Sequence, residues 1–80
     1  MDPLSLKSIV VFSTTTDAMA AEAAVREEAF PARLIPVPRE IRASCGMALM
    51  TEPEREKELL SLLEEKGVPT EGTWQVHLKL

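Results

Sequence analysis

The sequence has very few residues that bind metals or form covalent crosslinks. Cys45 is the only cysteine and His77 the only histidine among the 80 residues. A single cysteine cannot form a disulfide within its own chain, and these two side chains cannot supply the four ligands of a structural zinc site. We therefore expect no metal and no cofactor, so the fold must depend on the packing of its side chains.

Aromatic residues are also scarce, which limits how a core can be built. Tyrosine is absent, and the aromatic residues are Phe12, Phe30 and Trp74. A chain of this length hides only about 60–65% of the surface that it exposes when unfolded. Hydrophobic residues nevertheless make up 45% of the sequence. We therefore expect residues 1–80 to form a single domain with an aliphatic core.

Positive charge is in deficit, which argues against nucleic acid as a partner. The formal net charge is −4 at pH 7, whereas nucleic-acid-binding surfaces are basic and often carry stacking aromatic residues. No segment approaches the ~18 apolar residues of a membrane span, and the short apolar run at residues 9–12 is unlike a signal peptide. A lone free cysteine suits a reducing compartment. We expect a cytoplasmic protein that binds neither nucleic acid nor membranes.

Hydrophobic periodicity predicts four strands and two helices. Short runs of β-branched and aliphatic residues are typical of strands, whereas apolar residues spaced three or four apart indicate helices. This β-α-β-β-α-β order is the ferredoxin-like pattern, an α+β fold in which both helices cover one face of a four-stranded antiparallel sheet. The strands are expected at residues 7–13, 32–36, 46–50 and 73–80, and the helices at residues 14–30 and 51–67.

Residues at the helix ends support this assignment. The Thr14–Thr16 run can cap the first helix, and Pro31 should end it. Thr51 and Glu54 match a capping box at the start of the second helix, and Gly67 is a suitable C-cap. The apolar faces expected to pack on the sheet are Ala18, Ala21, Val25 and Ala29 in the first helix and Leu59, Leu60, Leu62 and Leu63 in the second.

Cys45 is expected at the end of the molecule where the first helix begins. In the ferredoxin-like topology, the turn before the first helix and the connection between the second and third strands lie at the same end of the sheet. The Ser13–Thr16 turn should therefore lie near Cys45. A helix N-terminus carries partial positive charge, and Arg39 and Arg42 add charge from the same connection, so that the thiolate form is favoured. Gly46 allows a positive φ beside the sulfur and leaves room for a partner.

Other interpretations stay open. A free cysteine is often a buried and inert hydrophobic residue. In that case the protein is an interaction or regulatory module, and the helix-free face of the sheet around Trp74 could form a homodimer. A thiol that senses oxidants would instead form a reducible dimer through Cys45. His77 is expected at the surface, and no base lies at a recognisable spacing from Cys45, so the sequence argues against an autonomous enzyme.

Three stretches of the chain resemble the selenium/sulfur carrier protein-like family. They are FSTTTDAMAAEAAV, ARLIPVPREIRASCGMAL and EKGVPTEGTWQV, and the resemblance extends from about Lys7 to Val76. Its most specific part is Pro-Arg-Glu-Ile followed closely by Ser-Cys-Gly, here Pro38–Ile41 and Ser44–Gly46. Phe30 departs from the family pattern at the end of the first helix, where we expect a glycine followed by a β-branched residue.

The resemblance implies that Cys45 carries sulfur or selenium, as a persulfide or perselenide, between a cysteine-desulfurase-type donor and an acceptor enzyme. The family's cysteine falls on Cys45, its Pro-Arg on Pro38 and Arg39, and its Ser/Thr-rich turn on Ser13–Thr16. Cys45 is therefore expected to be the functional residue. The residues expected to bind the carried atom are Thr14, Thr15, Thr16, Arg39, Arg42, Ser44 and Gly46.

Overall fold

The structure is a computed structural model that describes residues 5–42 and 45–78. Within these ranges the chain forms one four-stranded sheet, two α-helices and a short 3₁₀-helix. In chain order the elements are β1 (Ser5–Val11), α1 (Thr15–Glu27), β2 (Arg33–Pro36), β3 (Met47–Thr51), the 3₁₀-helix η1 (Pro53–Arg55), α2 (Glu56–Glu65) and β4 (Gly72–Leu78).

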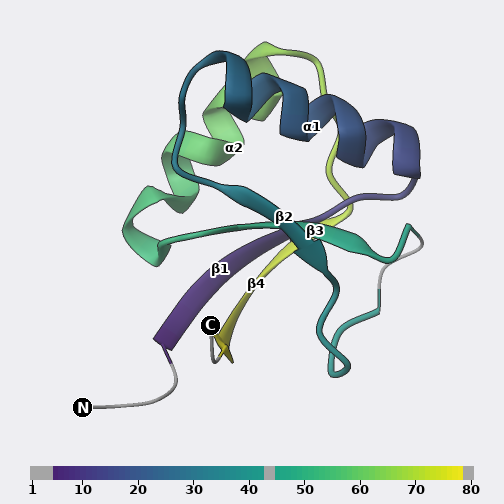
Figure 1. Cartoon of the computed structure of the whole chain (residues 1–80), viewed down its shortest axis with the longest axis vertical. Coiled ribbons are helices and arrows are strands. Elements are labelled where there is room, and N and C mark those ends of the chain that lie inside the picture. Colours follow the sequence, from purple (N-terminus) through teal and green to yellow (C-terminus); the bar gives the residue numbers. More distant parts are fainter. Residues whose placement is uncertain (1–4, 43–44, 79–80) are drawn as a thin grey trace.

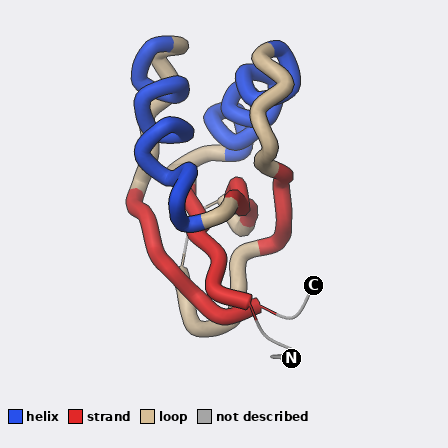
Figure 2. Tube along the Cα trace, turned by 90° about the vertical axis from the view of Figure 1, so that its left-hand side faces the viewer, coloured by secondary structure: helices blue, strands red, loops and turns tan. Residues whose placement is uncertain are grey.

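The sheet has the strand order β2-β3-β1-β4, and every pair of neighbouring strands is antiparallel. Both α-helices lie on one face of the sheet (Figures 1 and 2). This arrangement confirms the predicted α+β fold of ferredoxin-like type. β1 begins two residues earlier than predicted, because β4 pairs with it as far as Ser5. Neither α-helix in the described ranges has the length and hydrophobicity that crossing a membrane requires.

Alternation along β1 sends successive side chains to opposite faces of the sheet. Val10 and Phe12 are fully buried and pack against the apolar faces of α1 and α2. α1 contributes mainly alanines, so that it can lie close to the sheet. Ala29, predicted on this face, is exposed, and Ala24 is buried instead. We call the residues buried between the sheet and the two helices the helix-side core. They are Val10, Phe12, Ala18, Ala21, Ala24, Val25, Leu49, Leu59, Leu63 and Val68.

The other face of the sheet has a core of its own, closed by the connection between β2 and β3. Residues 37–42 of this β2–β3 loop (residues 37–46) lie on the side of the sheet away from the helices (Figure 1). Its turn is closed by the Ile41 N–H, which donates to the Pro38 carbonyl at 3.0 Å, and the Ile41 side chain is only 8% exposed. The sequence interpretation assumed that the helix-free face of the sheet was open. The β2–β3 loop covers part of this face, so the face is not open there. The buried residues of this second core are Ile9, Val11, Ile35, Ile41, Ala48 and Met50.

The two helices begin differently from one another. Thr14 is the N-cap of α1, as predicted, and its Oγ1 accepts a hydrogen bond from the Asp17 N–H at 3.1 Å. The capping box predicted at Thr51 and Glu54 is wrong. Thr51 is the buried last residue of β3, and its hydroxyl donates to the Pro31 carbonyl at 2.9 Å. η1 precedes α2 instead, and the N-cap residue of α2, Arg55, makes no side-chain capping bond.

Both helices end in the same hydrogen-bond pattern, the Schellman motif. In α2 the Gly67 N–H donates to the Glu64 carbonyl and the Val68 N–H to the Leu63 carbonyl, with Gly67 at φ 73°. In α1 the corresponding position is Ala29, which has φ 52°. The α1 motif is completed by the bonds Ala29 N–H to Arg26 carbonyl and Phe30 N–H to Val25 carbonyl, and Phe30 packs against the helix-side core.

We expect Ala29→Gly to raise the free energy of unfolding by about 0.5–1 kcal/mol. A left-handed conformation costs a non-glycine residue roughly 1–2 kcal/mol, and the greater freedom of glycine in the unfolded chain removes part of the gain. The melting temperature should rise by a few degrees, roughly 2–6 °C. Thermal unfolding followed by circular dichroism measures this shift.

The matched control for this substitution is Gly67→Ala. A Cβ at Gly67 would meet no atom within 4 Å, so the substitution tests the backbone conformation alone. It should lower the free energy of unfolding by about 1 kcal/mol. If Ala29→Gly lowers the melting temperature as Gly67→Ala does, a left-handed conformation at residue 29 is not a source of strain in this fold.

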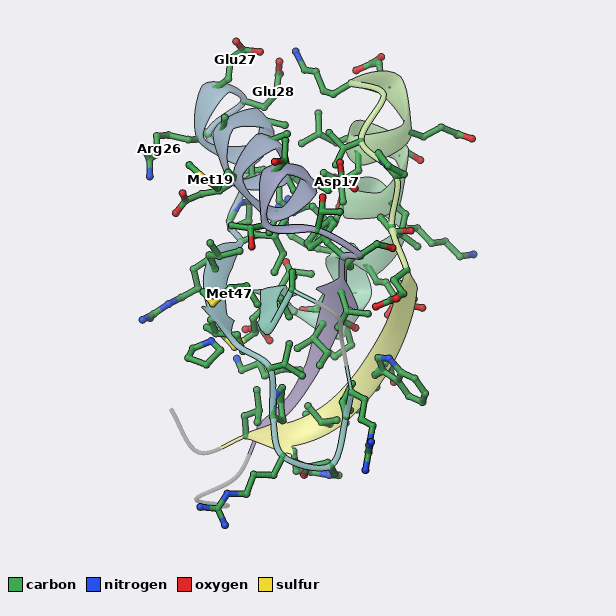
Figure 3. The ribbon with its side chains drawn as sticks, turned by 90° about the vertical axis from the view of Figure 1, so that its right-hand side faces the viewer. Asp17, Met19, Arg26, Glu27, Glu28 and Met47 are labelled. Carbon is green, nitrogen blue, oxygen red and sulfur yellow. The ribbon has the colours of Figure 1, made fainter. Side chains whose placement is uncertain are left out.

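Lys66 joins the C-terminal ends of the two helices. Its Nζ lies 2.6 Å from Glu27 Oε1 and 3.4 Å from Glu28 Oε2. Figure 3 shows both glutamates at the far end of α1 from Asp17. The hydrogen bond and the charge of Lys66 hold the pKa of Glu27 below its ordinary value of 4.5. The same contacts with Glu27, and the hydrogen bond that Lys66 donates to Glu28, raise the pKa of Lys66 above 10.5.

These shifts predict how the stabilisation by this ion pair depends on pH. Because the pKa of Glu27 is lowered in the folded state, its contribution is present above pH 4.5 and is lost as the pH falls through the folded value. Because the pKa of Lys66 is raised, its contribution is present below pH 10.5 and is lost as the pH rises through the folded value. Lys66→Met should therefore be less stable than the wild type at neutral pH only.

Urea unfolding at acidic, neutral and alkaline pH measures the difference between Lys66→Met and the wild type. The difference is expected to be small, and high salt should reduce it, because the partners are exposed. Lys57→Met is the matched control on the same helix, since Lys57 makes no ion pair with any of the described residues. A difference of equal size at all three pH values would mean that Lys66 stabilises the fold through its apolar stem instead of its charge.

Candidate functional site

Cys45 lies at the end of the β2–β3 loop, two residues before β3 begins. Its side chain is half-buried and packs against the helix-side core. The sulfur folds back onto the first residue of β3. Cys45 Sγ donates to the Met47 carbonyl at 3.2 Å and accepts a hydrogen bond from the Met47 N–H at 3.3 Å. These two hydrogen bonds fix the position of the thiol against the Met47 backbone. If the thiol loses its proton, the Met47 N–H can still donate to the resulting thiolate.

Gly46, the residue after Cys45, borders open space. It has φ 77°, the left-handed conformation that the sequence predicted, and a Cβ built on it would meet no atom within 4 Å. The Gly46 carbonyl accepts a hydrogen bond from the Val37 N–H at 3.0 Å, which ties the two ends of the β2–β3 loop together. Cys45 therefore lies on a closed turn, and the open space in this turn is beside the Gly46 backbone.

The sheet register brings Cys45 to the same end of the molecule as the start of α1. Val11 pairs with Ala48, so the residues that follow β1 lie beside those that precede β3. Figure 1 shows the start of β3 next to the start of α1, and Figure 3, which views this end, shows Met47 below the helix that carries Asp17. The Thr14 side chain caps α1 by accepting a hydrogen bond, and Thr15 and Thr16 are exposed in the first turn of the helix.

Both arginines of the loop are exposed. Arg39 is exposed, in the turn that the hydrogen bond from the Ile41 N–H to the Pro38 carbonyl closes. Arg42 is also exposed, and three residues of chain, at most about 11 Å, separate its backbone from that of Cys45. In the described part of the chain, neither guanidinium makes a hydrogen bond to the Cys45 sulfur. Ser44, the remaining predicted binding residue, lies outside the described residues.

The remaining candidates lie away from this end. His77 is exposed and pairs with Leu6, near the opposite end of β1 from the Cys45 loop. Trp74 is 50% exposed on β4, beside the second core. Among the described residues, no group of three or more histidine, cysteine, aspartate or glutamate side chains could hold a metal ion.

Sequence reasoning missed two contributors to the geometry of this site. The Met47 backbone fixes the Cys45 sulfur, and the pattern of side chains carries no signal for such a contact. Ile41 anchors the loop in the second core. Its signal was present in the sequence, because Ile41 is a large aliphatic residue between two charged residues of a loop.

A family model covers residues 7–75 of the chain, and its description is "Putative Se/S carrier protein-like". The chain belongs to this family. The matched residues include the whole β2–β3 loop and the start of α1, and therefore every residue that the sequence predicted for the site. No curated protein and no solved structure matches the chain. The Se/S carrier family membership thus agrees with the resemblance seen in the sequence.

Proposed function

We propose that the protein is a carrier that holds one sulfur or selenium atom on Cys45, as a persulfide or perselenide. The observation that carries this proposal is the position of the Cys45 sulfur, hydrogen-bonded to Met47 on a turn beside the open space at Gly46. Membership of the Se/S carrier family supports it. The partners that this function requires are a donor of the cysteine desulfurase type and an acceptor enzyme, and the proposed location is the cytoplasm.

The transfer step follows ordinary thiol–persulfide exchange. The Cys45 thiolate attacks the outer sulfur of the donor's cysteine persulfide. A new bond forms between that sulfur and Cys45, the S–S bond of the donor breaks, and the donor cysteine leaves as a thiolate that takes up the proton lost by Cys45. Transfer to the acceptor repeats the exchange in the opposite direction. No external oxidant or reductant is consumed, because one S–S bond replaces another.

The groups around Cys45 are suited to the anionic forms in this exchange. The Met47 N–H already donates to the sulfur. The first turn of α1 has positive partial charge, and the exposed residues Thr15 and Thr16 belong to it. The proposed binding residues are Thr14, Thr15, Thr16, Arg39, Arg42, Ser44 and Gly46.

A carrier function also accounts for the residues that the chain lacks. With no second cysteine, a persulfide on Cys45 cannot be resolved into an internal disulfide. His77 lies near the opposite end of β1, so it is not placed to act as a base toward Cys45. We therefore propose that the protein is not an enzyme by itself.

Loading by a donor enzyme tests this function. The wild-type protein is incubated with a cysteine desulfurase and cysteine, or with a selenocysteine lyase and selenocysteine, and its intact mass is measured without reductant. We expect the added mass of one sulfur or selenium atom, removed again by a thiol reductant. A wild-type protein that acquires no mass from either donor would contradict the carrier function.

The packing of Cys45 also supports a second function, that of an interaction module with a structural cysteine. The thiol is half-buried, packs against the helix-side core and donates its own proton to Met47. The rate of alkylation against pH separates the two functions. Slow reaction at neutral pH with a midpoint above about 8.5 favours the interaction module, whereas rapid reaction at neutral pH favours the carrier.

A further inference from the structure

The two edges of the sheet are protected very differently. β2 forms one edge; it has four residues, ends at Pro36 and is flanked by Pro31 and Pro38. Short edge strands with prolines resist pairing with other chains. β4 forms the other edge and has seven residues, with no proline and no aspartate, glutamate, lysine or arginine. Within the described residues, no element pairs with the outer side of β4.

β4 also presents an apolar stripe along this unprotected edge. Trp74 is 50% exposed, one of the few large hydrophobic side chains exposed among the described residues. Val76 and Leu78 follow on the same face and are half-buried at the border of the second core. The opposite face of β4 carries exposed polar residues, Gln75 among them. The edge thus combines unpaired backbone groups with an apolar surface.

We propose that β4 is a homodimer interface, at which β4 of a second copy pairs antiparallel and extends the sheet. With Val76 opposite the partner's Val76, Trp74 lies opposite the partner's Leu78, and Gln75 lies opposite the partner's His77. The apolar face of each strand then meets the apolar face of the other, and the polar residues meet on the opposite face. Such aromatic–aliphatic pairs are the units that stabilise antiparallel sheets. The two-fold axis is perpendicular to the sheet, so the helices of both copies lie on one side.

The lack of formal charge on β4 favours a second copy of this chain over a charged strand from another protein. Each copy has a formal charge of −4, so two copies repel one another at most surfaces. Residues 72–78 carry no formal charge, so pairing these strands opposes no like charges. A charged strand from another protein would instead place its charges beside Trp74. Cys45 lies before β3, which is separated from β4 by β1, so the dimer leaves the thiol accessible.

Sedimentation velocity across protein concentrations tests the dimer, and Trp74 supplies an internal probe because it is the only tryptophan. One pair of strands makes a small interface, so we expect the dimer to form between roughly 10 µM and 1 mM. The Trp74 emission should shift to the blue over the same range. Trp74→Glu should weaken the dimer at least about tenfold. The matched control is Met19→Glu, which removes a 62% exposed side chain on α1 and adds the same charge; it should leave the dimer unchanged.

Disulfide trapping tests the register in a Cys45→Ala background. Val76→Cys should crosslink rapidly under a mild oxidant, because residue 76 faces itself across the two-fold axis. Thr73→Cys should not, because its sulfurs would lie roughly 20 Å apart. Circular dichroism of each variant establishes that it is folded. A protein that is monomeric at all concentrations, equal weakening by Trp74→Glu and Met19→Glu, or crosslinking through residue 73 but not residue 76 would each overturn the proposal.

Discussion

A Cys45→Ala variant is expected to acquire no sulfur or selenium from a donor that loads the wild-type protein. Cys45 is the only thiol in the chain, so the substitution removes the only atom that can form a persulfide. The fold should survive, because the side chain is half-buried and its two hydrogen bonds reach only the Met47 backbone. The stability loss should stay within about 1 kcal/mol. Intact mass after loading gives the result directly.

Cys45→Ser is the matched variant for this experiment. Its hydroxyl can keep both hydrogen bonds to Met47 but cannot accept a sulfur atom from a persulfide. Both variants should therefore remain unmodified while circular dichroism shows an unchanged fold. An adduct on either variant that equals the wild-type adduct would show that the added atom is not bound to Cys45, and the proposed function would then fail.

Ile41→Ala is expected to lower the free energy of unfolding by about 2–4 kcal/mol. Ile41 is 8% exposed and closes the second core over Ile9 and Val11, so truncation leaves a cavity under the sheet. A loss of this size is a large part of the 5–15 kcal/mol that typically stabilises a domain. Urea unfolding followed by circular dichroism measures it.

The control for Ile41→Ala is Val37→Ala in the same loop. Val37 is only half-buried against the second core, so we expect a loss of about 1 kcal/mol or less. Because Ile41 anchors the loop four residues before Cys45, its truncation should also increase the rate at which Cys45 is alkylated. If Ile41→Ala costs no more than Val37→Ala, the loop does not depend on the second core for its position.

The order of the elements could be predicted because it depends on local patterns. Strand-like and helix-like periodicity gave the β-α-β-β-α-β order, and Gly67 gave the end of α2, since the left-handed cap is a backbone preference of glycine. The capping box predicted at Thr51 is wrong because a tertiary contact fixes the Thr51 side chain instead. Thr51 belongs to β3 and donates to Pro31 from a different part of the chain.

The candidate site was predictable only in its coarse placement. Topology alone predicts that the loop before β3 and the turn before α1 share one end of the sheet, and the register of Val11 with Ala48 agrees with this. The half-burial of Cys45 was not predictable. It depends on how closely the loop packs on the helix-side core, which side-chain spacing along the chain does not report.

The sequence by itself determined the order of the strands and helices, the positive φ at Gly46 and the single sulfur beside it. These features follow from preferences that act over a few neighbouring residues. Only the tertiary structure decided that Ile41 closes a second core, that Met47 holds the Cys45 sulfur and that β4 is an unprotected edge. Each of these depends on which distant segments meet across the sheet, and the free energy of burial acts between those segments regardless of their separation in sequence.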